Sequence, residues 1–368
     1  MSMSRRRAIA LIGGGVVLAA VGATVGFAAS RTPARALAPW SLAGRDADPR
    51  RRALSFAILA PNPHNRQPWL ADLRQPDRIV IHRDRERNLP ETDPFDRQMT
   101  IGMGCFVELL ALAAAQDGHA VGFEFFPEGE DGPVAVATFR DGGTPDPLFA
   151  HVLDRRSCKE PFEERAVPAG LVKELSAHAT VIDAPDTVAR LKDLTWEAWE
   201  IEALTPRTFR ESVDLMRFGK REIEANPDGI DLGGAFLEGL MMAGLLTRES
   251  QLDPTSTAFG EGVRMYRAML AATPAYVVLT SDGNDRIDQI ESGRRWMRLN
   301  LATTGMGLAL HPVSQALQEF AEMAGTRARV HELLAAPGQT VQMLGRLGYG
   351  PITGPSPRWP VETRIMNG

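Results

Sequence analysis

Three prolines stand within ten residues at positions 60–69, where the sequence reads APNPHNRQPW, and this segment constrains the path of the chain most strongly. Each proline fixes φ at about −65° and biases the preceding residue toward extended geometry. We therefore expect Asn62, Asn65 and Gln67 to be held in set directions as a polar ledge. Amides carry donors and acceptors, which suits a heterocycle edge that presents ring nitrogens beside carbonyls. The alternative is an ordinary proline-rich turn.

A second polar segment, residues 154–162, reads DRRSCKEPF. Arg155, Ser157 and Lys159 alternate with other residues, so in an extended chain their side chains share one side. A guanidinium offers two parallel donors to a phosphate, and a hydroxyl adds a further hydrogen bond. The lysine could face another part of the same ligand. On composition alone, the alternative is a solvated run of charges.

Together the two segments resemble the FMN-binding nitroreductase superfamily, and more closely its exported, internally duplicated Acg-like branch. In that branch one chain carries both halves of an intertwined dimer. The resemblance runs from about residue 50 to the end of the chain. It implies an α+β, nitroreductase-like fold in which two half-repeats form a pseudo-dimer around central helices, with an inserted helical lid. It also implies FMN as the cofactor and a monomer that is itself a pseudo-dimer.

The family pattern Arg-x-Ser/Thr-x-Lys/Arg matches Arg155, Ser157 and Lys159. By the resemblance, Arg155 would hold the phosphate, Ser157 the phosphate or ribityl chain, and Lys159 the N1 and C2-carbonyl side of the ring. The family pattern Pro-Ser-x-x-Asn-x-Gln-Pro-Trp is read across residues 61–69. It would set four residues against the isoalloxazine: Pro63, His64, Asn65 and Gln67.

Two later segments extend the resemblance. Residues 295–315 read as a helix that stops near Gly305 or Gly307, followed by a short strand and a proline-containing turn. In the family, the backbone of such a turn lies near the reactive N5 edge of the flavin. The matching positions are Pro312, Val313, Ser314 and Gln315. Residues 344–360 resemble the closing strand and the C-terminal phosphate arginine, which is Arg358 here. Taken singly, a core helix and a basic tail would also explain them.

The sequence departs from the family pattern at three positions. Asn62 stands where a small hydroxyl is common, Cys158 stands where a polar residue is common, and Glu160 places a negative charge beside the expected phosphate site. Neighbouring side chains of an extended segment point to opposite sides, so we expect Glu160 to point away, next to Arg156. None of the three departures excludes flavin binding.

The N-terminal residues 1–38 have the form of a twin-arginine export signal, with three arginines ahead of an uncharged run at 8–29. Small residues lead up to a cleavage site after Ala38. Pro39 disfavours that cut, so a cut near residues 28–29 is the alternative. About 20 residues can cross a bilayer, so a retained membrane anchor is a further alternative.

Export by the twin-arginine machinery carries folded proteins, which suits a cofactor inserted in the cytoplasm. The expected location is therefore periplasmic or otherwise extracytoplasmic. Without residues 1–38 the chain loses five arginines and no acidic residue, which moves the formal net charge from −5 to −10. That charge argues against a nucleic-acid partner, which requires a basic face.

Two cysteines are too few for a disulfide framework. Cys105 lies in an apolar helical run, which predicts a core residue, and Cys158 could lie near the cofactor. The seven histidines show no ligand spacing, so no metal is expected.

We expect a first half at 39–150 and a second half at 151–368, the latter with a helical insertion at about 195–263. A long apolar helix at 99–116 should pack centrally against its counterpart near 299–304. Strands are expected at 79–82, 123–126, 134–139 and 275–280. The Gly- and Met-rich core of the insertion, 233–246, would be a lid if it covers the flavin. The alternative is an oligomer contact or added packing.

Two functions of different classes remain. The first is an FMN-dependent oxidoreductase that passes electrons to a nitroaromatic or quinone-like small-molecule acceptor, with Lys159 stabilising charge on the ring. NAD(P)H is the donor that the resemblance implies, although it is scarce outside the cytoplasm, and no catalytic acid or base is assigned. The second is a non-catalytic protein that binds or sequesters FMN under a closed lid. The substrate cannot be read from the sequence.

Overall fold

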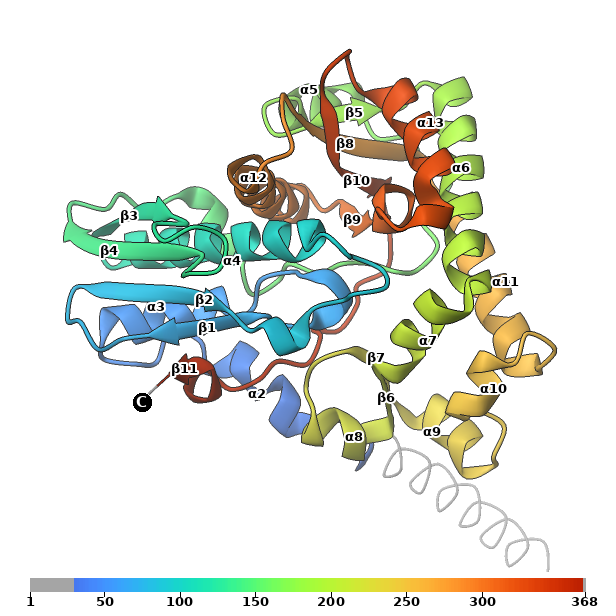
Figure 1. Cartoon of the computed structure of the whole chain (residues 1–368), viewed down its shortest axis with the longest axis horizontal. Helices are drawn as coiled ribbons and strands as arrows, with labels where there is room; N and C mark the ends of the chain where they lie inside the picture. Colours follow the sequence, from blue (N-terminus) through green and yellow to red (C-terminus); the bar gives the residue numbers. More distant parts are fainter. Residues whose placement is uncertain (1–29, 367–368) are drawn as a thin grey trace, which may run out of the picture.

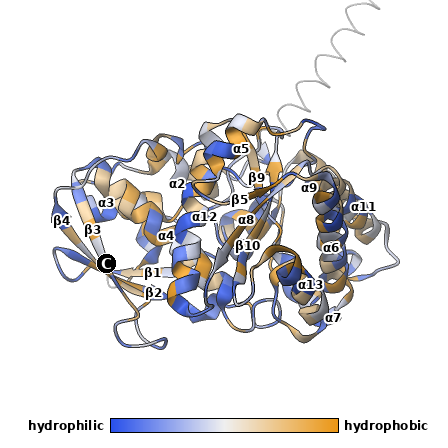
Figure 2. Cartoon of the chain, turned by 90° about the horizontal axis from the view of Figure 1, so that it is seen from above, coloured by the Kyte–Doolittle hydropathy of each residue, from blue (hydrophilic) through white to orange (hydrophobic). Residues whose placement is uncertain are grey.

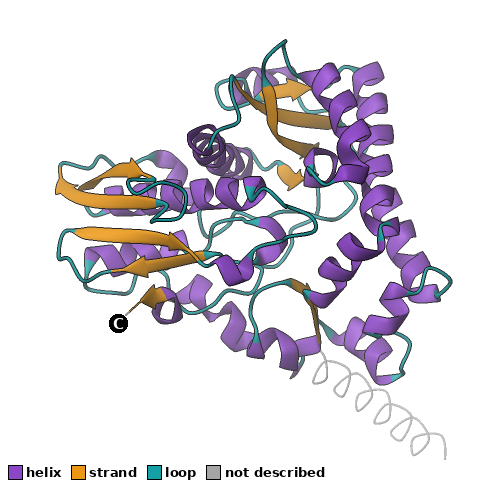
Figure 3. Cartoon of the chain, in the orientation of Figure 1, coloured by secondary structure: helices purple, strands orange, loops and turns teal. Residues whose placement is uncertain are grey.

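The computed structural model describes residues 30–366 of the 368-residue chain. Most of the predicted export signal, residues 1–29, therefore lies outside the described residues. The described residues fold into an α+β structure with two larger sheets and a helical arm that contains a third, two-stranded sheet (Figures 1 and 3). This confirms the predicted α+β class.

The two larger sheets share one order of four antiparallel strands. In the first sheet, four strands are neighbours in the order first, second, fourth and third along the chain: β1 (Trp69–Asp72), β2 (Arg78–Arg83), β4 (Ala135–Asp141) and β3 (His119–Phe125). The second sheet repeats this order with β5 (Thr180–Ile182), β8 (Ala275–Ser281), β10 (Thr340–Gly348) and β9 (Ala309–Pro312). The strands predicted within these ranges are confirmed.

One long helix connects the same pair of strands in each half. Helix α4 (Arg97–Gln116) links β2 to β3, and helix α12 (Arg286–Gly305) links β8 to β9. The shared strand order and helix position show that the fold repeats itself. α4 confirms the helix predicted at 99–116, and α12 begins earlier than predicted while ending at the expected glycine.

α4 and α12 pack against each other between the two sheets (Figure 1). A Cβ atom at Gly104 would lie 2.9 Å from the Gly293 Cα and would collide with the Ile290 carbonyl. The Cys105 thiol donates to the Gly293 carbonyl at 3.2 Å, and burial raises its pKa to about 12. α4 is apolar and long enough to cross a membrane, but 83% of the relevant window is buried inside the fold. Both glycines thus allow the backbones to meet, and Cys105 is a core residue.

The chain ends bind the halves together. β11 (Ile365–Met366) returns from the second half and pairs in parallel with β1 of the first half. The nearby N-terminal helices are α2 (Ala34–Leu42) and α3 (Pro49–Ala57). The second half also contains α5 (Ala169–Leu175) and α13 (Ala324–Leu334). Short 3-10 helices are η1 (Pro63–Asn65), η2 (Arg85–Arg87), η3 (Pro147–His151), η4 (Ser314–Leu317), η5 (Ala321–Met323) and η6 (Val361–Arg364).

The insertion forms an arm of helices on one side of the molecule, which Figure 2 shows from above. The rings of Trp199 and Tyr266 stack with their centres 4.9 Å apart, and this contact joins the first and last helices of the insertion. The predicted bounds, about 195 and 263, fall inside those two helices. Its elements are α6 (Pro185–Leu204), α7 (Pro206–Asp214), β6 (Met216–Phe218), α8 (Gly219–Ala225), β7 (Ile230–Leu232), α9 (Ala235–Met242), α10 (Arg248–Leu252) and α11 (Thr257–Ala271).

Glu202 fixes the end of α6 to the second half. Its carboxylate accepts hydrogen bonds from Gln318 Nε2 at 2.9 Å and from Ser212 Oγ at 3.2 Å. Burial raises the pKa of Glu202 to about 7, because desolvation outweighs these two donors. The root of the insertion is therefore held by a buried acid.

Gly104→Ala tests the helix crossing. We expect a loss of roughly 1–3 kcal/mol or more in unfolding free energy, because a methyl group has no room between the two backbones. Gly262→Ala is the matched control: it lies inside α11 with open space at its Cβ, so it should stabilise by about 0.5–1 kcal/mol. Urea unfolding of both variants measures this, and equal effects would refute the close contact.

Candidate cofactor site

The polar ledge at 60–69 is more strained than its prolines predict. Asn62 is extended, with φ −158° and ψ 160°, as expected before Pro63. Gln67 also precedes a proline but has φ 51°, so the extended geometry expected there is wrong. His64 and Asn65 are likewise left-handed, with φ 46° and 52°. Such residues cost about 1–3 kcal/mol each and persist only where their surroundings hold them.

The contacts of Gln67 explain its geometry. This side chain is completely buried, and its backbone N–H donates to Asn62 Oδ1 at 2.7 Å. Its amide nitrogen donates to the Pro227 carbonyl of the insertion at 2.6 Å, and its amide oxygen accepts from the Trp359 N–H at 2.9 Å. Hydrogen bonds to three segments thus offset the strained backbone. The ledge is fixed by the insertion and the C-terminal segment.

Asn65 is held by the same C-terminal segment. Its amide oxygen accepts from Arg358 Nη1 at 2.6 Å, and its amide nitrogen donates to the Pro357 carbonyl at 3.1 Å. The predicted contacts of Pro63, His64, Asn65 and Gln67 with an isoalloxazine remain predictions. In the structure, Asn65 and Gln67 position neighbouring groups.

A buried carboxylate locks the insertion onto the ledge. Asp228 accepts from Arg87 at 2.5 Å, from Arg217 at 2.7 Å and from Arg66 at 3.3 Å. The next residue, Gly229, donates its N–H to the Asn65 carbonyl at 3.2 Å. Three arginines from both sides of the junction therefore share one acid. Sequence reasoning missed this contact because Asp228 carries no motif.

Arg155 and Arg358 meet at one carbonyl oxygen. Arg155 Nη2 and Arg358 Nη2 donate to the Leu59 carbonyl at 3.0 and 3.1 Å. Arg155 Nη1 also donates to Asn300 Oδ1 of α12 at 3.0 Å. The two side chains are only 3% and 2% exposed. The structure therefore brings together the two arginines that the sequence predicts for a phosphate, although they are about 200 residues apart.

The charges of these two arginines are not balanced by a contacting carboxylate. Within residues 30–366, no carboxylate forms an ion pair with either one, and the Nε atom of each is buried without an acceptor. Burial and then neighbouring arginines lower the pKa of Arg155 to about 10 and that of Arg358 to about 9. Asp231 of β7 acts on Arg358 only from a longer distance. Buried charges are normally paired, so this geometry suits an anion.

Ser157 and Lys159 continue from Arg155 in a segment without regular secondary structure. Its backbone is tied to β9 by one bond, from the Cys158 N–H to the Leu310 carbonyl at 3.0 Å. Cys158 is buried and Glu160 is exposed. Burial raises the pKa of the Cys158 thiol, so the thiolate is disfavoured there.

Lys159 is electrostatically linked to two histidines. Burial, followed by the charges of Lys159 and Arg66, lowers the pKa of His64 to about 4. Burial, Arg346 and Lys159 also hold the pKa of His311 well below its usual value. Both rings are therefore neutral at neutral pH. The lysine, the ledge and β9 thus border one region, and their grouping around a flavin remains a prediction.

The predicted turn at Pro312–Gln315 follows directly from β9. The buried Val313 donates its N–H to the Leu344 carbonyl at 2.9 Å, and Ser314 and Gln315 begin η4. Within residues 30–366, no hydrogen bond links Ser314 or Gln315 to the arginine pair. Their place near a flavin therefore remains a prediction.

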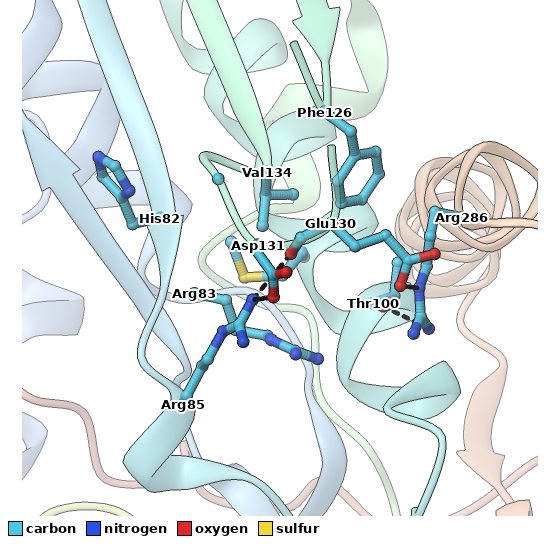
Figure 4. Close-up of a pocket in the computed structure, with 11 residues that line it drawn as sticks. His82, Arg83, Arg85, Thr100, Phe126, Glu130, Asp131, Val134 and Arg286 are labelled. Atoms are coloured by element: carbon cyan, nitrogen blue, oxygen red, sulfur yellow. Dashed lines mark hydrogen bonds and ion pairs between the residues drawn. The ribbon is translucent and has the colours of Figure 1, made fainter. Parts of the chain in front are cut away.

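A small cavity lies elsewhere, beside the turn between β3 and β4 (Figure 4). Its arginines are paired: Arg83 with Asp96 at 2.7 Å, and Arg286 with Glu130 at 2.8 Å. Because β3 and β4 correspond to β9 and β10, this is the position in the first half that matches the Pro312–Gln315 turn. Its volume of about 80 Å³ is well below the roughly 300 Å³ of a small-molecule pocket. It does not suit a flavin.

Comparisons with known proteins agree with the sequence patterns. Two Mycobacterium tuberculosis proteins, named "Putative NAD(P)H nitroreductase Rv3131" and "Putative NAD(P)H nitroreductase MT3217", are each 24% identical over 341 residues. The match covers 86% of this chain and 93% of each relative. These relatives support a place in the nitroreductase-like superfamily. No protein-family model matches the chain.

Solved structures give a weaker likeness. The FMN-dependent nitroreductase NfnB from Mycobacterium smegmatis in complex with NADPH is 18% identical, with a TM-score of 0.37 over 59% of this chain and 96% of that one. A nitroreductase with bound FMN from Bacteroides fragilis is 13% identical, with a TM-score of 0.31 over 57% of this chain and 91% of that one. TM-scores below 0.5 do not define a shared fold.

Asp228→Asn tests the lock between insertion and ledge. Three arginines would lose the acid that they share, so we expect a loss of roughly 3 kcal/mol or more in stability and faster amide exchange at 228–232. Asp77→Asn is the control, because its pair with Arg78 is exposed at 4.0 Å and should contribute less than about 1 kcal/mol. Unchanged exchange at 228–232 would contradict the lock.

Proposed function

We propose that the protein is an FMN-dependent oxidoreductase of nitroreductase type that acts on a small-molecule electron acceptor. One observation carries the proposal: Arg155 and Arg358 are buried side by side without an ion-pair partner among residues 30–366. A phosphate would supply the missing negative charge and accept from their unused Nε donors. The two nitroreductase relatives support the same reading.

The residues near this pair suit the rest of a flavin. Ser157 stands two residues after Arg155, where the family pattern has the second contact to the phosphate or the ribityl chain. Lys159 places its positive charge near His64 and His311. FMN, when bound, supplies the transfer of two electrons as a hydride. Lys159 would stabilise negative charge at the N1 and C2-carbonyl side of the ring.

The neutral state of His64 and His311 limits which groups can supply protons to the electron acceptor. With a pKa of about 4, His64 is a neutral imidazole at neutral pH and not an imidazolium, and His311 is neutral for the same physical reason, burial next to cations. Neither is therefore a general acid at pH 7. Protons for the acceptor would come from solvent, so access to the ring controls the reaction.

The acceptor in this proposal is a nitroaromatic or quinone-like compound, and NAD(P)H is the donor. We also propose the internally duplicated, Acg-like arrangement, which the shared strand order of the two sheets supports. Export by the twin-arginine route is part of the same proposal and is based on the sequence of residues 1–38. In that case the protein works outside the cytoplasm with FMN already bound.

A non-catalytic flavin-binding protein is the second candidate. The observation that favours it is the bonding of the insertion to the ledge through Asp228, Gly229 and Pro227. An arm fixed in this way could act as a closed lid that sequesters the cofactor. The two candidates differ in whether bound flavin accepts electrons from an added donor.

Arg155→Ala tests the cofactor assignment. Removing a charged hydrogen-bond donor should weaken FMN binding by about 1.5–3 kcal/mol, or roughly 10- to 100-fold in Kd. Arg140→Ala, at an exposed position near the end of β4, should leave FMN binding unchanged. Fluorescence titration with FMN measures both. A colourless wild-type protein that fails to bind added FMN would refute the proposed function.

Replacing residues 233–246 with a short Gly/Ser linker distinguishes the oxidoreductase from the non-catalytic flavin-binding protein. The anchors at Asp228 and Glu202 lie outside the deleted stretch, so the remaining arm should stay attached. If the stretch covers the flavin, NADPH should bleach it faster under anaerobic conditions, because access limits the reaction. A lower rate or a higher KM with a quinone would instead place the stretch in the substrate pocket. No change would show that it lies away from the flavin.

A further inference from the structure

Helix α2 packs onto the arginine pair from the N-terminal side. Its Trp40 is 8% exposed, and the indole N–H donates to the Ser356 carbonyl at 2.8 Å. The Arg358 N–H donates to the Ala36 carbonyl of the same helix at 2.8 Å. The segment that leads to Arg358 is therefore bonded to α2 at two points. The first five residues of α2, 34–38, belong to the stretch 1–38 that the sequence predicts as an export signal.

Three guanidinium groups surround the Trp40 ring. Their carbon atoms lie 4.7 Å (Arg156), 5.6 Å (Arg358) and 5.8 Å (Arg155) from the ring centre. All three distances fall within the roughly 6 Å range of cation–π attraction. The attraction of the three guanidinium groups to the Trp40 ring therefore offsets part of the repulsion between them.

The third arginine, Arg156, also has a buried Nε donor without an acceptor. Arg156 Nη1 donates to the carbonyls of Leu153 and Arg155 at 2.8 and 2.7 Å, while its Nε is buried without an acceptor. Within residues 30–366, no carboxylate forms an ion pair with any of the three arginines. Three buried Nε donors without an acceptor thus occur around a single aromatic ring, and the carboxylates that act on these charges, Asp154 on Arg156 and Asp231 on Arg358, do so without an ion pair. An indole face attracts cations but cannot accept these hydrogen bonds as an oxyanion does.

We propose that Trp40 and Arg156 complete a binding site for a phosphate monoester, which they form together with Arg155 and Arg358. This rests on the proposed function in one respect, namely that the phosphate is the one at the end of FMN. Trp40 acts as a positioning residue, because it contacts the arginines and holds them in place for the anion. Arg156 adds a third cation beyond the two that the sequence pattern predicts.

The proposal has a consequence for processing of the N-terminus. A cut after Ala38 would remove Ala36 and most of α2, and would make Trp40 the second residue of the shortened chain. The site therefore requires that α2 stays in the mature protein. Any cleavage must then occur before Ala34, which agrees with the alternative cut near residues 28–29 and with a retained anchor.

Binding of FMN and of riboflavin by the full-length protein tests the site, because riboflavin lacks the phosphate. Trp40→Leu should weaken FMN binding at least about tenfold while changing riboflavin binding less than about twofold, and Trp40→Phe should recover most of the loss. Arg156→Ala should likewise weaken the binding of FMN more than that of riboflavin. Because Arg156 is partly exposed, its replacement should leave the protein folded. Trp199→Leu, in the distant stack on α6, is the control and should not distinguish the two flavins.

Equal weakening of FMN and riboflavin by Trp40→Leu and by Arg156→Ala would overturn the proposal, as would no effect on either flavin. If the wild-type protein binds neither flavin, the proposed function fails, and inorganic phosphate then tests the site by itself. Phosphate should raise the wild-type Tm relative to chloride at equal ionic strength, and the rise should be lost in Arg156→Ala. No rise with phosphate would overturn the anion site. Mass spectrometry of the exported protein should find residues 34–40, and an N-terminus at Pro39 or beyond would overturn the requirement for α2.

Discussion

The contact between α4 and α12 at Gly104 and Gly293 is the constraint on which the rest of the structure depends. The two backbones meet without side chains between them, so the sheets on either side approach closely enough for segments of one half to reach the other. Asn300 of α12 then contacts Arg155, and Arg155 contacts Leu59 of the first half. The candidate site is thus a product of the helix crossing and belongs to neither half alone.

The arginines of this structure are balanced in two different ways. At the cavity beside the turn between β3 and β4, Arg83 and Arg286 have acidic partners, whereas Arg155 and Arg358 have no ion-pair partner among residues 30–366. A satisfied ion pair has no spare charge for a ligand, while a buried unpaired guanidinium favours one. Charge balance therefore supports the proposed phosphate at Arg155 and Arg358 and not at the cavity.

Sequence patterns predicted the elements and the arginines because both depend on local signals. The apolar run of α4, the alternating strands and the spacing of Arg155, Ser157 and Lys159 can all be read without long-range information. Proline rules failed at Gln67, because hydrogen bonds from distant segments outweigh a local backbone preference. Asp228 and Trp40 gave no signal for a related reason. Their partners come from segments far away in the chain, and no spacing rule connects them.

The attachments of the insertion also indicate where it can move. Its root is held through Glu202 and its middle through Asp228, and releasing Asp228 would separate one acid from three arginines. α9 has weaker attachments: Phe236 and Met242 are 78% and 68% exposed, while the buried Glu238 pairs with Arg31. Local opening follows the least stable contacts. We therefore expect motion in α9 and the segment after it, with the ledge and the arginine pair remaining fixed, so that access to the candidate site can change without disturbing the proposed phosphate contacts.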